Sequence, residues 1–302
     1  DSLLQESFIQ INKTNEQLKL NLQAEDFKDT RTLINRKILE NGFLLIEILY
    51  QGNSVYNGWV DISKTTFIYD VNLLVEKQRY IWENYYWNTD GKWTYSYDAN
   101  NNMIEELYQE LNSGNWENIS KFTFTYDTNN NMIEELYQVW NGSNWTISWK
   151  YIYAYDTNNN IIKELKQTWN GSNWVNSVQT IFIYDENNTM IEELNQEWSG
   201  SEWLNNLKQT YTYDSTNYKI EELWQNWDGS NWINYLTLGF TYDANNNLIE
   251  SIWQIWEDYN WVNYRKYTYS YNVNNIKTET IYFAWWATVW IKDTRWIYTY
   301  DA

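Results

Sequence analysis

The sequence of 302 residues contains no cysteine, no histidine and no proline. The absence of cysteine and histidine excludes disulfide bonds, thiolate or imidazole metal sites, and catalytic arrangements of the Ser-His-Asp or Cys-His kind. The absence of proline suits long, fully paired β-strands, because each proline removes a backbone donor from the hydrogen-bonding ladder.

Basic residues and long apolar runs are also scarce. Lysine and arginine number 21 against 40 aspartates and glutamates, which gives a formal net charge of −19 that is spread along the chain. Nucleic-acid binding needs a basic stripe, so we expect no nucleic-acid partner. Residues 1–20 lack the basic start and apolar core of a signal peptide, and no run of 18 apolar residues occurs, so we expect no membrane insertion.

Aromatic residues are abundant, and they recur with a fixed period. The dipeptide Tyr-Asp returns after 28 residues once and after 29 residues thereafter. Tryptophans form two further columns with the same period, one running from Trp87 to Trp290 and one from Trp82 to Trp285, with Leu111 as its exception. The shared phase predicts nine tandem copies of one unit. The central copies of the dipeptide, which we take as structural repeat residues, are Tyr126, Asp127, Tyr155, Asp156, Tyr184, Asp185, Tyr213, Asp214, Tyr242 and Asp243.

Each copy has the pattern of a β-hairpin. In the copy at 127–155, a turn cluster at 127–131 precedes an alternating run at 132–140, and a second turn at 141–144 precedes an alternating run at 145–155. Because a wide sheet must twist and coil, the sequence predicts an all-β fold of tandem hairpins of about 29 residues, forming a long antiparallel meander wound into a spiral or solenoid with its aromatic face inward.

The expected domain organisation follows the repeat. Residues 1–39 do not fit the period and are predicted to form an N-terminal capping segment over the first strand. Residues 40–302 hold the nine repeats, with boundaries near 70, 98, 127, 156, 185, 214, 243, 272 and 301.

A simple register follows from the four-residue turn at 141–144. It places Trp140 opposite Trp145 and Glu135 opposite Lys150. The same count places Glu106 opposite Lys121 and Glu193 opposite Lys208, so opposite charges would face each other in three units. In this register one face carries Trp140, Gln138, Leu136 and Glu134 together with Trp145, Ile147, Trp149, Tyr151, Tyr153 and Tyr155.

The run Tyr-Asp-x-Asn-Asn-Asn followed by a hairpin resembles the YD repeats of Rhs and teneurin-type shells. The segment Glu-Glu-Leu-Tyr-Gln-Val-Trp-Asn-Gly-Ser-Asn-Trp at 134–145 is similar to the Asn/Trp-rich arrays of large secreted surface proteins of Bacteroidetes. The resemblance covers residues 40–301 and implies an extracellular structural or adhesive array that coils as a β-spiral.

Two sequence patterns are similar to reactive sites. Neighbouring glutamates such as Glu134 and Glu135 point to opposite faces of a strand and recur in nearly every unit, so we expect no catalytic residues and no enzyme activity. The pattern of Asp127, Asn129 and Asn131 is similar to the first half of a calcium loop, although a hairpin turn explains the same residues. We therefore expect no cofactor or resident metal, with calcium at these turns as the alternative.

The tryptophan columns are the candidate ligand site. Aromatic rings beside Glu134 and Gln138 suit stacking on sugar rings, while packing within a wound sheet explains the same rings, and their exposure decides between the two. The residues in question are Trp140, Trp145, Trp169, Trp174, Trp198, Trp203, Trp227 and Trp232.

The sequence therefore favours a non-enzymatic structural or interaction array of a large secreted or cell-surface protein, such as a filament or shell segment. Its expected partners are copies of itself or other surface components, because unpaired strand edges favour association. A carbohydrate-binding adhesin that uses the tryptophan columns is the first alternative, and a fragment of an Rhs-like shell is the second.

Overall fold

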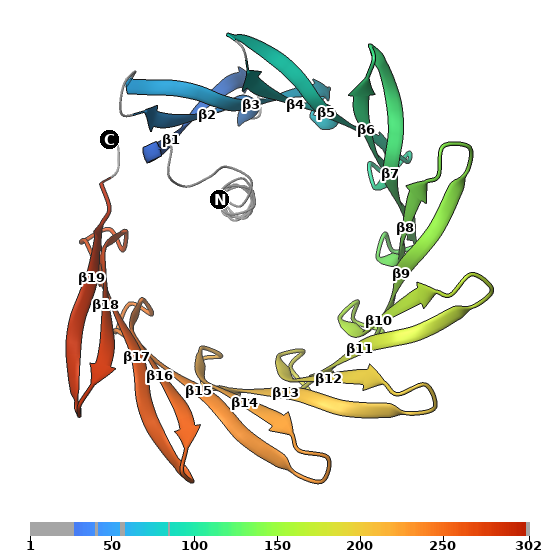
Figure 1. The fold of residues 1–302 in the computed structure, drawn as a ribbon. Coiled ribbons are helices and arrows are strands. Elements are labelled where there is room, and N and C mark those ends of the chain that lie inside the picture. Colours follow the sequence, from blue (N-terminus) through green and yellow to red (C-terminus); the bar gives the residue numbers. More distant parts are fainter. Residues whose placement is uncertain (1–26, 40–41, 55–57, 84, 300–302) are drawn as a thin grey trace. The chain divides into compact units, whose positions relative to one another are not determined.

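The computed structural model describes residues 27–39, 42–54, 58–83 and 85–299. Within these ranges the chain forms nineteen β-strands and no helix, and Figure 1 labels the strands in sequence order. This confirms the predicted all-β meander of tandem hairpins. Most of the expected capping segment, residues 1–26, and the last Tyr-Asp copy at 300–301 lie outside the described residues.

The strands follow one another at the spacing of the repeat. They are β1 (Phe27–Leu39), β2 (Gly42–Ser54), β3 (Gly58–Asp70), β4 (Leu73–Glu83), β5 (Tyr86–Tyr97), β6 (Met103–Asn112), β7 (Asn115–Tyr126), β8 (Met132–Trp140), β9 (Trp145–Tyr155), β10 (Ile161–Trp169), β11 (Trp174–Tyr184), β12 (Met190–Trp198), β13 (Trp203–Tyr213), β14 (Lys219–Trp227), β15 (Trp232–Tyr242), β16 (Leu248–Glu257), β17 (Asn260–Tyr271), β18 (Lys277–Trp286) and β19 (Val289–Ile297).

The chain divides into two compact units. The described residues within 1–125 and 136–148 form the first unit, and those within 126–135 and 149–302 form the second. In the first unit the strands from β1 to β7 pair in sequence order, each antiparallel to the next. In the second unit the strands from β9 to β19 do the same. Sequence neighbours are thus spatial neighbours in each unit.

The turn that begins a central copy is built by its aspartate. In the copy at 127–131, the Asp127 Oδ1 atom accepts hydrogen bonds from the backbone N–H groups of Asn129 and Asn131, and Asp127 Oδ2 accepts one from the Asn131 side chain. Asn130 has a φ of 64°, in the left-handed region that asparagine tolerates. The Asp-x-Asn-Asn-Asn pattern is therefore a side-chain-closed turn, as the hairpin interpretation predicted.

The hairpin tip at residues 141–144 confirms the four-residue turn predicted there. At residues 141–144 the backbone N–H of Asn141 donates to the Asn144 carbonyl oxygen at 3.1 Å. Gly142 has a φ of 92°, which explains the glycine at this position. In the equivalent hairpin β10–β11, Trp169 pairs directly with Trp174, as the sequence predicts for the repeat.

Beyond the tryptophans the predicted register is wrong by one residue. In β12–β13, Trp198 pairs with Trp203 and Gln196 with Asn205, but Asn195 pairs with Leu207, which leaves Asn206 as a β-bulge. Lys208 therefore pairs with Leu194 instead of Glu193. The bulge recurs in the other hairpins, so that Lys121 pairs with Leu107 and not with Glu106.

The bulge also changes which residues share a face. We call the side that carries Trp198, Gln196, Leu194 and Glu192 the tryptophan face, and the side that carries Glu193, Leu207 and Tyr211 the tyrosine face. The prediction that the tyrosines lie on the tryptophan side is wrong, because the Tyr153 hydroxyl donates to Glu135 and the Lys150 ammonium pairs with Glu134. At a β-bulge two residues of one strand lie opposite a single residue of its partner. Every later side chain of the bulged strand therefore points to the other face.

The described chain has little enclosed core. Its buried apolar side chains are Tyr50, Ile62, Leu236 and Leu238, and no large side chain in the described part is fully enclosed. Six polar side chains are buried as well, among them Gln179, Glu222 and Ser251. Contacts between side chains of neighbouring strands therefore stabilise the strand pairs, and most of these side chains are only half-buried.

Candidate functional site

The tryptophan pairs lie beside the hairpin tips. In the pair Trp198–Trp203 the ring centroids are 5.1 Å apart and the planes meet at 62°, an edge-to-face arrangement. The same arrangement, with centroids 4.8–5.3 Å apart, joins Trp82–Trp87, Trp140–Trp145, Trp169–Trp174, Trp227–Trp232, Trp256–Trp261 and Trp285–Trp290. Each pair contributes about 0.5–1.5 kcal/mol beyond its buried area. The predicted ligand residues therefore come together as pairs within single hairpins.

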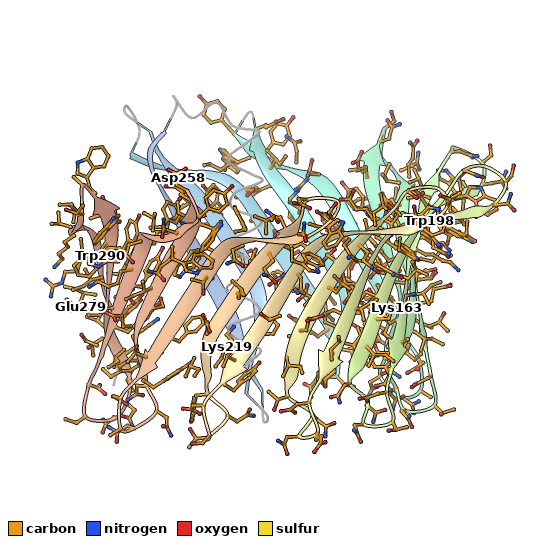
Figure 2. The ribbon with its side chains drawn as sticks, turned by 90° about the horizontal axis from the view of Figure 1, so that it is seen from below. Lys163, Trp198, Lys219, Asp258, Glu279 and Trp290 are labelled. Atoms are coloured by element: carbon orange, nitrogen blue, oxygen red, sulfur yellow. The ribbon has the colours of Figure 1, made fainter. Side chains whose placement is uncertain are left out.

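All eight predicted ligand tryptophans are half-buried. None of Trp140, Trp145, Trp169, Trp174, Trp198, Trp203, Trp227 and Trp232 is buried, and none is fully exposed. Trp198 is labelled in Figure 2, which shows side chains projecting from the strands. The rings serve packing and still offer part of their surface to solvent.

A column of lysines links hairpins to their successors. The Lys150 Nζ atom lies 2.9 Å from a Glu134 carboxylate oxygen and 4.9 Å from the centroid of the Trp174 ring in the following hairpin. Lys121 stands in the same way between Glu105 and Trp145, and Lys266 between Glu250 and Trp290. Such a lysine gains a counter-ion and a cation–π contact together.

The lysine column has two interruptions. Its position is taken by Gln179 and by Thr237, both of which are buried. No lysine lies over Trp203 or Trp261 in the described part of the chain, although these rings stand 24 residues after Gln179 and Thr237, as Trp174 does after Lys150. In the first of these hairpins the usual glutamate is also replaced, by Lys163, which Figure 2 labels.

Paired amides form a further column next to the tryptophans, which the sequence analysis missed. The Gln225 Nε2 atom donates to Asn234 Oδ1 at 2.9 Å, and Gln225 lies two residues from Trp227 on the same face. The same bond joins Gln109–Asn118, Gln167–Asn176, Gln196–Asn205 and Gln254–Asn263 at 2.7–2.9 Å. The 29-residue recurrence of glutamine in the sequence is the signal that would have revealed it.

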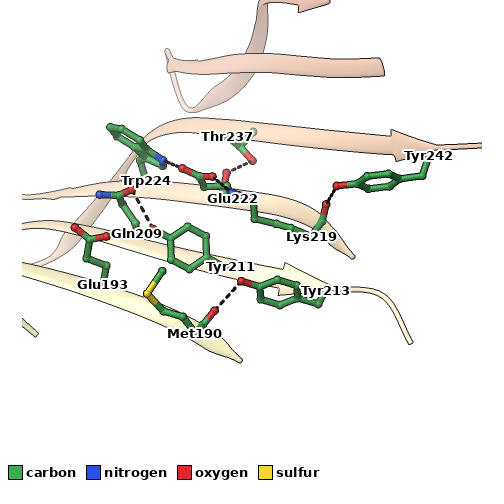
Figure 3. A network of polar contacts seen from close by, with 10 residues as sticks. All are labelled: Met190, Glu193, Gln209, Tyr211, Tyr213, Lys219, Glu222, Trp224, Thr237 and Tyr242. Carbon is green, nitrogen blue, oxygen red and sulfur yellow. Dashed lines mark hydrogen bonds and ion pairs between the residues drawn. The ribbon is translucent and has the colours of Figure 1, made fainter. Parts of the chain in front are cut away.

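Carboxylates form a column on the tyrosine face. Glu135, Glu164, Glu193 and Glu222 recur every 29 residues, so they lie on every second strand. Figure 3 shows part of this column. Glu222 accepts hydrogen bonds from Lys219 and from the Trp224 indole, both at 2.6 Å, and Glu193 accepts one from the Tyr211 hydroxyl at 3.3 Å. The carboxylate of Glu164 has neither a hydrogen bond nor an ion pair with the described residues.

Burial and mutual repulsion perturb this column. The pKa of Glu164 is raised above its ordinary value by loss of solvation and by the charges of Glu193 and Glu135. The pKa of Glu193 is likewise raised, first by burial and then by Glu222, while the hydrogen bond from Tyr211 opposes the shift. Such pKa shifts occur both at functional sites and in structural networks of charged groups. Because the glutamates recur in successive units, a structural network is favoured here.

The structural repeat residues have separate roles. The tyrosine of the dipeptide donates to a backbone carbonyl 23 residues earlier in several copies, as Tyr155 does to Met132 and Tyr184 to Ile161. The aspartates of the central copies, such as Asp156 and Asp185, close the turn that follows. Asparagines of neighbouring turns also bond to each other, for example Asn160 Nδ2 to Asn188 Oδ1 at 3.2 Å.

The turn geometry bears on the calcium alternative. Hydrogen bonds from the turn already engage both carboxylate oxygens of Asp127. No group of three or more His, Cys, Asp or Glu side chains able to hold a metal ion is found in the described part of the chain. Nor does any helix there have the length and apolar character needed to span a membrane.

Comparisons with known proteins found distant structural likenesses. No family model matches the chain, and no curated protein matches it. Among solved structures, a Bacteroides fragilis protein of unknown function matches with 22% identity over 39% of this chain and 91% of that one, at a TM-score of 0.35. A DUF3836 family protein of Bacteroides vulgatus matches with 25% identity over 29% of this chain and 91% of its own, at 0.26. The TcdB2-TccC3-TEV structure matches with 12% identity over 89% of this chain and 16% of that one, at 0.38. Likenesses at these scores carry no functional argument.

Proposed function

We propose that the chain is a non-catalytic structural and interaction array, made of YD-like repeats, that forms part of a large extracellular or cell-surface protein. The observation that carries this proposal is that the same side-chain links join successive hairpins. They are the lysine that reaches the next tryptophan and the asparagine bonds between neighbouring turns. Contacts that recur with the repeat stabilise an array by nearest-neighbour terms.

The distribution of reactive groups supports a non-catalytic role. Carboxylates adjacent in the sequence lie on opposite faces, as Glu134 with Lys150 and Glu135 with Tyr153 illustrate. A catalytic site needs groups with distinct roles that converge on one point, whereas these groups repeat at intervals along the sheet.

Self-association is the proposed interaction, with further surface components as additional partners. The net charge of −19 opposes association at low salt, and screening relieves this repulsion at physiological ionic strength. The exposed, asparagine-rich turns suit an extracellular surface, in keeping with the secreted arrays that the sequence resembles.

Two measurements test the proposal. Sedimentation velocity of the intact chain, over a hundredfold range of concentration at low and moderate salt, is expected to show a mass that rises with concentration and more steeply with salt. A monomer under all of these conditions would remove self-association from the proposal. Surface labelling of producing cells is expected to reach the protein without lysis, and labelling only after lysis would remove the extracellular location.

A further inference from the structure

Four consecutive hairpins, from β10 to β17, present the same group of side chains on the tryptophan face. Each hairpin has an edge-to-face tryptophan pair and an adjacent pair of bonded amides. We propose that this strip, defined by Trp169/Trp174, Trp198/Trp203, Trp227/Trp232 and Trp256/Trp261 with their amide pairs, binds a neutral, extended polysaccharide that runs across the strands. This inference goes beyond the structural role and does not depend on it.

The spacing of the strip suits a linear polymer. Equivalent groups lie two strands apart, which is about 10 Å at the usual distance between neighbouring strands. This is close to the length of a disaccharide in an extended β-1,4-linked glycan. A straight polysaccharide would therefore present the same face of a sugar ring at each hairpin. Within a hairpin, Gln225 and Trp227 are two residues apart and point to the same face.

The chemistry of the strip suits sugars. In each amide pair the glutamine Nε2 donates to the asparagine Oδ1, which leaves a glutamine oxygen as acceptor and an asparagine N–H as donor. At Gln196 the oxygen also accepts from Gln179 Nε2, so there the asparagine donor remains. Half-exposed indole rings can pack on the C–H face of a pyranose while the amides bond its hydroxyl groups.

Charge and access favour a neutral ligand. The lysine column loses its charge at Gln179 and Thr237, within the strip, and Lys266 is paired with Glu250. A charged polymer would find no continuous row of opposite charge. Lysines lie over the rings of Trp174 and Trp232, but in the described structure none lies over the equivalent rings of Trp203 and Trp261. Two of the four tryptophan pairs therefore have a ring that no lysine covers.

The amide pairs are not needed to close a hairpin. In β8–β9 the position of the asparagine is taken by Ile147, and the pair Trp140–Trp145 keeps its geometry, with centroids 5.2 Å apart and planes at 63°. On the tyrosine face of the strip the position between the amide and the tryptophan varies freely, as Thr168, Glu197, Asn226 and Ile255. A hairpin of this repeat therefore folds without the amide pair, which leaves the four pairs of the strip available to a ligand.

Affinity electrophoresis of the intact chain tests the proposal. The probes are hydroxyethyl cellulose as a neutral, extended β-1,4 polymer, dextran as a neutral flexible one, and polygalacturonate as an extended anionic one. We expect retardation by hydroxyethyl cellulose and at least tenfold weaker retardation by the other two. No retardation by hydroxyethyl cellulose, or equal retardation by dextran or by polygalacturonate, would overturn the proposal.

Variants with a matched control sharpen the test. The double variant Gln225→Met/Gln254→Met removes two amide pairs inside the strip, and we expect at least a tenfold loss of affinity. Gln109→Met removes the same kind of pair beside Leu111, outside the strip, and we expect less than a twofold change. Thermal unfolding followed by circular dichroism verifies that both variants fold. Unchanged affinity in a folded double variant would contradict the assignment.

A further variant tests the tryptophans of the strip and leaves the amide pairs unchanged. Trp256→Leu reproduces the Leu111–Trp116 pairing of β6–β7, which the repeat already accommodates. We expect hydroxyethyl cellulose to protect the tryptophans of the unchanged chain from acrylamide quenching, and this protection to fall by more than a quarter in Trp256→Leu. Equal protection in both chains would show that the polymer does not contact this pair and would overturn the proposed strip.

Discussion

The hydroxyl of Tyr213 donates a hydrogen bond of 2.8 Å to the backbone carbonyl oxygen of Met190, at the start of the preceding strand, as Figure 3 shows. The equivalent bonds of Tyr97, Tyr155, Tyr184, Tyr242 and Tyr271 are 2.8–3.0 Å long. The tyrosine of the Tyr-Asp dipeptide thus joins the end of the second strand of its hairpin to the start of the first strand.

Removal of this hydroxyl is expected to destabilise the second unit. Tyr213→Phe keeps the ring and leaves the Met190 carbonyl without its donor, so we expect the free energy of unfolding to fall by about 1 kcal/mol. Urea denaturation measures the change. Tyr235→Phe is the control, because the Tyr235 side chain is half exposed, and it is expected to have no measurable effect. Equal effects of the two changes would show that the hydrogen bond is not responsible.

The carboxylate column predicts an unusual dependence of stability on pH. Because the folded-state pKa of Glu164 is raised, the folded chain binds protons more readily there than the unfolded chain does. This contribution to stability is greatest below the unfolded-state pKa and is lost as the pH rises through the folded-state pKa. Between pH 5 and pH 7 we therefore expect the stabilising contribution of Glu164 to decline as the pH rises.

Glu164→Gln tests this expectation by thermal unfolding across that pH range. The variant is expected to be more stable than the unchanged chain at pH 7 and to differ less from it at pH 5, because the buried charge is gone. Glu134→Gln is the matched control on the other face, where it breaks the ion pair with Lys150, and it is expected to destabilise. A loss of stability in Glu164→Gln at pH 7 would contradict the repulsion between column neighbours.

The turn aspartates predict the opposite trend in acid. Hydrogen bonds from Asn247 hold the pKa of Asp243 below its usual value. The associated stability is present above the unfolded-state pKa and is lost as the pH falls through the folded-state pKa. Asn272 makes the same backbone hydrogen bonds in its own turn, so an amide can replace the carboxylate.

Asp243→Asn is therefore expected to fold with nearly unchanged stability at pH 7 and to lose less stability in acid than the unchanged chain. Asp243→Ala removes the acceptor and is expected to destabilise at both pH values. Chemical denaturation at pH 7 and pH 3 measures both variants. Equal stability of the Asn and Ala variants would refute the role of the side-chain acceptor.

The tip of β18–β19 predicts a stabilising substitution. Ala287 and Thr288 have φ values of 44° and 75°, and a β-branched residue is strained in the left-handed region. Thr288→Gly relieves this strain, and we expect a gain of about 1 kcal/mol in the free energy of unfolding. The reverse change, Gly229→Ala at a φ of 99°, is expected to destabilise although the added Cβ meets no atom. Thermal unfolding of the two variants measures these opposite shifts.

The sequence was sufficient for features that depend on a few neighbouring residues. Alternation with period two and the turns at 127–131 and 141–144 predicted the hairpins, because backbone preferences of asparagine, aspartate and glycine act locally. The pairing of the tryptophans across the tip followed from the loop length alone. The recurrence of the tryptophans was evident from the sequence, whereas the amide pairs beside them were not, and the ligand role of these tryptophans stays a prediction.

The register beyond the tip was decided by the tertiary structure. Adjacent glutamates such as Glu105 and Glu106 offer a partner to Lys121 in either register, so charge matching did not reveal the bulge. Aromatic residues occur on both faces, so hydrophobic alternation did not reveal it either. The extra residue is fixed by packing between strands, which a pattern along one strand does not record.

By itself, the sequence determined the repeat, the hairpin unit and the chemistry of each turn, because these rest on local backbone preferences and on spacing. Only the tertiary structure decided which side chains share a face and which hairpins they join, such as Lys150 between Glu134 and Trp174. Those contacts join residues 16 and 24 positions apart, and one bulged residue is enough to exchange the faces on which they meet.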